Sequence, residues 1–127
     1  MADFGFIPNL VAGGDINPFR FVELSAAFTC TQANAASDKI LGVTDGSVRL
    51  FGSTLNATTG DEVSLQPTNT VQVEASTGIS AGAILTTDSS GRAVTGTSGQ
   101  ICYYIALEAA SATGEIIRAF RLGPISA

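Results

Sequence analysis

The sequence contains no histidine and no tryptophan, and only 13% of its residues are charged. Without histidine it lacks the commonest general base, the Ser-His-Asp arrangement and the usual ligand of transition metals. Neither the acidic pattern of a calcium loop nor a glycine-rich phosphate loop with lysine occurs. We therefore expect no catalytic residues, no cofactor and no metal site, and an enzyme is disfavoured.

Positive charge is also scarce. The chain has five arginines and one lysine, which do not cluster in the sequence, and its formal net charge is −5. A surface that binds nucleic acid needs several cations on one face to neutralise phosphates, and a surface that binds anionic lipid has the same requirement. The sequence therefore predicts that neither nucleic acid nor a membrane is a partner.

Long apolar runs are missing too. No run approaches the ~20 residues of a membrane span, and the acidic start of the chain does not resemble a secretion signal. We therefore expect synthesis and folding in the cytoplasm. The two cysteines, Cys30 and Cys102, fit no metal-binding spacing. They are predicted to be buried free thiols, with a single disulfide as the alternative.

Apolar residues are abundant and make up 45% of the 127 residues. This length and composition suit one domain with its own hydrophobic core. The charged fraction is about half the usual ~25%. The surface must therefore consist largely of small polar residues, or part of it must be hidden against other proteins.

Short apolar runs separated by glycine, serine, aspartate and threonine extend along the whole chain. Ten strands without a convincing helix predict an all-β fold, namely a small single-domain β-sandwich or jelly-roll-like barrel. The run at 101–107 is apolar on both faces, which predicts a central strand or a strand at an interface. Gly123 and Pro124 are expected to end the last strand. The predicted strands are 19–24, 27–31, 40–43, 48–51, 62–65, 71–75, 83–87, 92–95, 101–107 and 116–122.

The two halves of the chain show a faint similarity to each other. Apolar positions and short motifs at 16, 24, 40–43 and 60–63 recur in the same order at 79, 85, 101–105 and 114–117. The spacing drifts, so the pattern is not that of a repeat array. Two copies of one β-motif packed face to face would explain it, and so would chance similarity between β-rich segments.

The first 13 residues form a separate unit. They are rich in phenylalanine and aliphatic residues, but Gly5 and Pro8 interrupt any helix or strand period. We predict an extended arm at 1–13, followed by the β-sandwich domain at 14–127. The arm is too apolar to be left in water. Two interpretations remain open, because it could fold back on its own core or pack on a neighbouring subunit.

Three stretches of the chain resemble a known family. They are GISAGAIL at 78–85, TDSSGRAV at 87–94 and IALEAASATGEIIR at 105–118. These stretches resemble the small capsid decoration, or cement, proteins of tailed bacteriophages, and GDINPFRFV at 14–22 looks like the opening of such proteins. The resemblance spans residues ~14–122 and leaves out the arm and the loop at 52–58.

The resemblance implies a β-sandwich or jelly-roll-like protein that has no catalytic residues and binds the outer surface of the phage capsid. Its expected partners are the major capsid protein and copies of itself. A closed homotrimer is favoured, and a dimer on two-fold positions is the second choice. The residues expected to contact the capsid or a sister subunit are Phe4, Phe6, Ile7, Pro8, Leu10, Val11, Phe19 and Arg20.

Two other functions remain open at this point. A tail or baseplate component of the virion would share the same composition. A carbohydrate-binding β-sandwich on the virion surface is a further alternative. Its weakness is the shortage of rings on which sugars could stack, because Tyr103 and Tyr104 are the only tyrosines and tryptophan is absent.

Overall fold

The structure, a computed structural model, describes residues 10–36, 39–45 and 59–127. Within these residues the chain forms ten strands and no helix, so the all-β prediction is confirmed. The predicted strand at 48–51 lies outside the described residues. The strands are β1 (Leu10–Ala12), β2 (Phe21–Ala26), β3 (Thr29–Gln32), β4 (Ile40–Val43), β5 (Glu62–Val63), β6 (Thr70–Glu74), β7 (Ile84–Thr87), β8 (Ala93–Thr95), β9 (Ile101–Ala106) and β10 (Ile116–Ser126).

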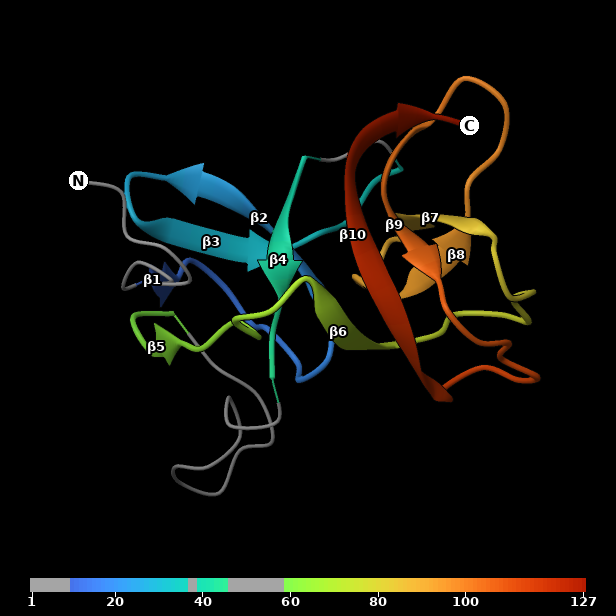
Figure 1. The fold of residues 1–127 in the computed structure, drawn as a ribbon. Coiled ribbons are helices and arrows are strands. Elements are labelled where there is room, and N and C mark those ends of the chain that lie inside the picture. Colours follow the sequence, from blue (N-terminus) through green and yellow to red (C-terminus); the bar gives the residue numbers. More distant parts are fainter. Residues whose placement is uncertain (1–9, 37–38, 46–58) are drawn as a thin grey trace.

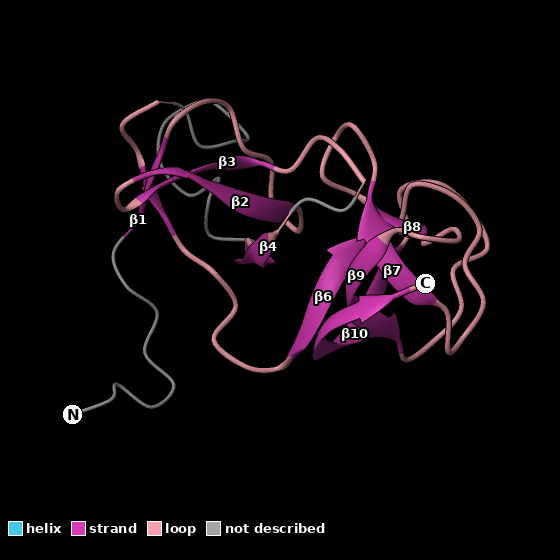
Figure 2. Ribbon diagram, turned by 90° about the horizontal axis from the view of Figure 1, so that it is seen from above, coloured by secondary structure: helices cyan, strands magenta, loops and turns pink. Residues whose placement is uncertain are grey.

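The strands form two five-stranded sheets, one from each half of the chain. The N-terminal sheet has the order β4-β2-β3-β1-β5, and the C-terminal sheet has the order β6-β10-β9-β7-β8. The two sheets lie beside each other along the long direction of the molecule, with the β2–β3 turn at one end (Figure 1). The view from above shows the same division (Figure 2).

Isolated bridges nearly close each sheet into a small barrel. An antiparallel bridge from Thr44 to Leu65 links the end of β4 to the residues after β5. A parallel bridge from Ala75 to Ala93 links the end of β6 to β8. Edges that are joined in this way leave fewer unpaired backbone groups exposed.

With these bridges included, the two halves have the same topology. In the first half β2 pairs antiparallel with β3 and β4, and in the second half β7 pairs antiparallel with β8 and β9. Strand β1 runs parallel to β3 and antiparallel to β5. Strand β6 likewise runs parallel to β8 and antiparallel to β10. This agreement favours two copies of one β-motif over chance similarity as the origin of the similarity between the halves.

The core consists of two clusters of buried side chains that lie on opposite faces of β2. Phe21 and Val22 are adjacent and both fully buried, but they belong to different clusters because successive residues of a strand point to opposite faces. The Val22 cluster lies within the N-terminal half. The Phe21 cluster joins the two sheets, and the rings of Phe21 and Tyr104 pack with centroids 5.2 Å apart.

Strand β9 is the third of five strands, so its predicted central position is confirmed. Within the chain only one face of β9 is fully buried, and an interface on its other face stays a prediction. Cys102, Tyr104 and Ala106 are buried, whereas Ile101 and Ile105 are only half-buried. Tyr104 and Ala106 belong to the Phe21 cluster, whereas Ile101 and Ile105 belong to neither core cluster.

The predicted end of the last strand at Gly123 and Pro124 is wrong. Strand β10 continues to Ser126. Its register with β9 shifts between Arg121 and Ile125, and Gly123 adopts a φ of 90°. Such a bulge takes Pro124, which has no N–H to donate, out of the regular ladder and lets pairing resume beyond it.

The cysteine prediction is confirmed, because Cys30 and Cys102 are both free and buried. Burial raises the pKa of both thiols. Each therefore stays protonated near neutral pH and packs as a small apolar side chain.

Candidate interaction surfaces

The described part of the predicted arm belongs to the protein's own N-terminal sheet. Leu10 is only 2% exposed and lies in the Val22 cluster, whereas Val11 is 40% exposed. Leu10 therefore packs on the protein's own core, and contact of Val11 with a capsid or a sister subunit stays a prediction. The other predicted arm contacts, Phe4, Phe6, Ile7 and Pro8, lie outside the described residues. Their contact with a capsid or a sister subunit stays a prediction.

Phe19 lies where the two sheets meet. It has a φ of 58°, which places a bulky residue in the left-handed region. Its N–H donates to the Thr44 carbonyl at 3.1 Å, and its carbonyl accepts from the Glu74 N–H at 3.0 Å. The backbone of this half-buried residue thus connects the N-terminal sheet to β6 of the C-terminal sheet.

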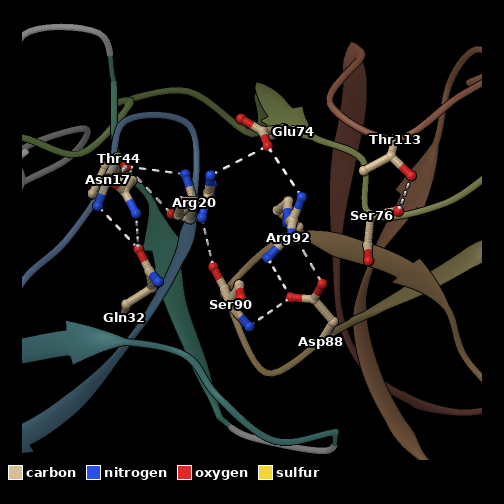
Figure 3. A network of polar contacts seen from close by, with 10 residues as sticks. All are labelled: Asn17, Arg20, Gln32, Thr44, Glu74, Ser76, Asp88, Ser90, Arg92 and Thr113. Carbon is tan, nitrogen blue, oxygen red and sulfur yellow. Dashed lines mark hydrogen bonds and ion pairs between the residues drawn. The ribbon is translucent and has the colours of Figure 1, made fainter. Parts of the chain in front are cut away.

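Arg20 takes part in a network of alternating charges at the same junction (Figure 3). Its guanidinium lies 3.2 Å from the Glu74 carboxylate and donates to the Ser90 carbonyl at 2.8 Å. Glu74 also pairs with Arg92 at 3.7 Å, and Arg92 pairs with Asp88 at 3.6 Å. The side chain of Arg20, only 13% exposed, therefore has its partners within the chain, and its predicted contact with another protein stays a prediction.

Asp88 fixes the turn that carries this network. Its carboxylate accepts from the backbone N–H groups of Ser90 at 2.8 Å and Arg92 at 2.9 Å. Burial by itself would raise the pKa of Asp88. Hydrogen bonds from the Ser76 side chain and from these two N–H groups outweigh it, together with the charge of Arg92, so the pKa lies below its usual value.

Arg121 makes a second connection between the sheets. It donates to the Ile40 carbonyl of β4 at 3.1 Å and to the Tyr104 hydroxyl at 2.9 Å. A pocket of about 170 Å³ lies beside it, lined also by Leu41 and Pro67. This volume is below the ~300 Å³ at which small-molecule sites usually begin, so the pocket does not support a ligand-binding function.

The C-terminal sheet carries an exposed apolar surface, which we call the outer face of the C-terminal sheet. It contains a row across three strands, because Phe120 of β10 pairs with Ile105 of β9, and Ile105 pairs with Ile84 of β7. Phe120 is 39% exposed, and Leu107 beyond β9 is 51% exposed. Apolar side chains grouped on one face are typical of a protein–protein contact.

A second exposed apolar surface lies at the turn between β2 and β3. We call residues 24–28 (Leu-Ser-Ala-Ala-Phe) the hairpin tip. All five are exposed and none is charged. Leu24 is 57% and Phe28 66% exposed, and Phe28 has a φ of 50°. Sequence reasoning missed this surface, because residues 27–31 read as a continuous strand and the tip contains no glycine to mark a tight turn.

Among the described residues no group of acidic, cysteine or histidine side chains could hold a metal ion. The described part of the chain also has no helix with the length and apolarity needed to cross a membrane.

Two comparisons with known proteins found a match, one to a family and one to a solved structure. A family model described as phage cement protein matches residues 9–121. Among solved structures, the N base of head fiber gp8.5 from bacteriophage phi29 is similar, with a TM-score of 0.68 and 19% sequence identity. The similarity covers 94% of this chain and 96% of that chain, and at this identity it concerns the fold alone. No curated protein matches the chain.

Proposed function

Because the chain belongs to the phage cement protein family, we propose that it binds the outside of a tailed-phage head and bridges neighbouring subunits of the major capsid protein. In this role it stabilises the shell against the outward pressure of packaged DNA. The observation that carries the proposal is the family match over residues 9–121, which includes both halves of the fold. As a member of this family it is a structural protein of the phage capsid.

The proposed mechanism is additive binding free energy. When two capsid subunits separate, the contacts that the cement protein makes across their joint must break as well. Each contact needs to bury only ~800 Å² per partner to be specific. Several contacts linked in one oligomer raise the effective affinity by orders of magnitude. A closed homotrimer is the favoured arrangement, and a dimer is the alternative.

The surface of the protein supports such a role. Exposed apolar side chains gather at the hairpin tip and on the outer face of the C-terminal sheet, although the chain as a whole carries a net charge of −5. Residues 1–9 immediately precede β1 and contain two phenylalanines. We propose that they act as a hook that pairs with a free sheet edge of the capsid or of a sister subunit.

The direct test is reconstitution on heads that lack the protein. Purified protein is added to such heads, which are then imaged by cryo-EM and analysed by calibrated mass spectrometry. We expect density at fixed positions on the outer surface, in constant ratio to the major capsid protein. Decorated heads should also release their DNA at a higher temperature than bare heads, as measured with a DNA-binding dye.

Two results would point to another function. If the protein is located along the tail of purified virions and does not bind heads, it is a tail or baseplate component. If the isolated protein binds host polysaccharide and leaves heads undecorated, the carbohydrate-binding alternative is correct. We expect synthesis in the host cytoplasm, where heads assemble, under the favoured proposal.

A further inference from the structure

Phe28 occupies a backbone conformation that this fold otherwise gives mainly to glycine. Among the described residues the positive φ angles belong to six glycines and to two phenylalanines, Phe19 and Phe28. A bulky residue in this region is strained, because its Cβ crowds the backbone. A two-residue β-hairpin with an adjacent bulge ordinarily has glycine in this position.

The equivalent turn in the second half shows the alternative. The β7–β8 turn corresponds to the β2–β3 turn in the shared topology, and there the positive φ belongs to Gly91, at 76°. That turn packs against the N-terminal half, since a Cβ on Gly91 would lie 2.7 Å from Gln32 Cγ. The β2–β3 turn instead lies at the end of the N-terminal sheet away from the C-terminal sheet (Figure 1). The first half therefore keeps an aromatic side chain at a turn position where glycine would fold with less strain.

The contacts of Phe28 within the described part of the chain do little to offset this strain. Phe28 is 66% exposed, the largest exposed fraction among the large apolar side chains of the described residues. Strain that is not offset by local contacts is typical of sites where a side chain is needed for a function. The side chain therefore points to a partner outside the chain.

Three hydrogen bonds fix the backbone of the hairpin tip. The Phe28 carbonyl accepts from the Val11 N–H of β1 at 2.9 Å. The Thr29 hydroxyl donates to the Ala27 carbonyl at 3.0 Å, and the Ser25 hydroxyl donates to the Thr29 carbonyl at 3.3 Å. A side chain presented on a preorganised turn loses less conformational entropy when it binds. Exposed aromatic anchors of this kind often carry most of the binding free energy of an interface.

We propose that Phe28 anchors the protein to the head by inserting into an apolar depression on the outer surface of the major capsid protein, with Leu24 packing beside it. This proposal rests on the proposed function. The partner must be apolar, because residues 24–28 carry no charge and their small residues cost little to desolvate. The capsid is chosen as the partner because the chain belongs to the phage cement protein family, and because the tip lies at the end of the N-terminal sheet away from the C-terminal sheet (Figure 1).

The test replaces Phe28 by glycine and measures stability and head binding separately. Glycine adopts positive φ freely, so the Phe28→Gly variant should unfold at the same temperature as the unmodified protein or a higher one. Its affinity for undecorated heads should fall at least tenfold. Phe28→Tyr should restore most of the binding. Ile125→Ala is the control, because it removes a side chain that is 41% exposed near the end of β10 and belongs to neither of the two apolar surfaces. It should bind heads normally.

Each other result overturns the proposal. If Phe28→Gly lowers the unfolding temperature by several degrees, Phe28 has a structural role, and Phe28→Asn, which tolerates the same backbone region, should then be destabilised too. If Phe28→Gly is stable and decorates heads normally, the anchor lies elsewhere while the proposed function stands. If it changes the oligomeric state measured by light scattering, the tip contacts a second copy of the chain. If the unmodified protein itself fails to bind heads, the proposed function fails independently of Phe28.

Discussion

The two halves of this protein have the same strand topology, yet their equivalent hairpin turns differ. The β7–β8 turn faces the junction between the sheets, where Asp88 fixes its backbone and Gly91 allows close approach. The β2–β3 turn faces solvent at the end of the N-terminal sheet away from the C-terminal sheet and presents Phe28. The comparison teaches that a duplicated motif can keep its fold while one copy of a turn serves cohesion and the other is free to contact a partner.

The largest expected difference is between Phe21, the first residue of β2, and Phe28, which lies in the turn between β2 and β3. Phe21 is fully buried between the sheets, whereas Phe28 is exposed. Replacing Phe21 by alanine should lower the free energy of unfolding by about 3–5 kcal/mol, because a large cavity remains at the junction. Phe28→Ala should change it by less than about 1 kcal/mol. Chemical denaturation of both variants measures the difference, and equal effects would contradict the assignment of roles.

Gly91 is the next largest expected effect. In Gly91→Ala the new Cβ would lie 2.7 Å from Gln32 Cγ and 3.1 Å from the Phe21 carbonyl oxygen, at a φ of 76°. We expect a loss of about 3 kcal/mol, from backbone strain and from displaced neighbours together. Gly114→Ala is the matched control, since its φ is 89° but nothing lies within 4 Å of the added Cβ. Gly114→Ala therefore measures the backbone strain alone. If it loses as much unfolding free energy as Gly91→Ala, the close contacts of Gly91 with the N-terminal half do not contribute to the loss.

Asp88 should have a smaller, pH-dependent effect. The lowered pKa means that folding favours the ionised carboxylate, so this contribution is present above the unfolded pKa near 3.8 and is lost as the pH falls through the lower folded pKa. Asp88→Asn should cost about 1 kcal/mol at pH 7, since its neutral amide accepts more weakly from the turn N–H groups. The difference in unfolding free energy between the two proteins should shrink as the pH falls below 3.8. A difference that is constant across this range would contradict the role given to ionisation.

Removal of residues 2–9 should have the smallest effect on stability. The first described strand begins at Leu10 and its contacts to β3 and β5 remain. We expect the unfolding temperature to be nearly unchanged, while decoration of heads weakens if these residues act as a hook. A control deletion that extends through Ala12 removes β1, and it should lower the unfolding temperature clearly. Normal head binding by the shorter deletion would leave the hairpin tip as the remaining candidate at this end of the molecule.

The comparison between expected and observed strands shows where local pattern is informative. The runs at 40–43 and 71–75 correspond closely to β4 and β6, because their alternation or branched residues depend on nearest neighbours alone. The turn at Asp88 is equally local, because its carboxylate accepts from the backbone N–H groups of Ser90 and Arg92. Which face of β9 is buried within the chain could not be predicted, because both faces are apolar.

The candidate surface was harder to predict than the strands. The pairing of Arg20 with Glu74 could not be predicted, because the two residues are 54 positions apart in the sequence. The exposure of Phe28 could not be recognised, since an aromatic residue between two strands is ordinarily a core residue. Two features of the sequence could have indicated an exposed apolar turn. They are the uncharged run at 24–28 and the lack of a turn-forming glycine between β2 and β3.

By itself, the sequence determined the all-β class, the approximate strands, the absence of histidine chemistry and the resemblance to phage cement proteins. These properties depend on composition and on the short-range alternation of apolar and polar residues, which can be read from each segment alone. Only the tertiary structure decided that the two halves share one topology, that Arg20 and Gly91 hold the sheets together, and that Phe28 stands exposed. These features depend on which distant segments pack together, and packing between segments far apart in the chain leaves no periodic trace in either of them.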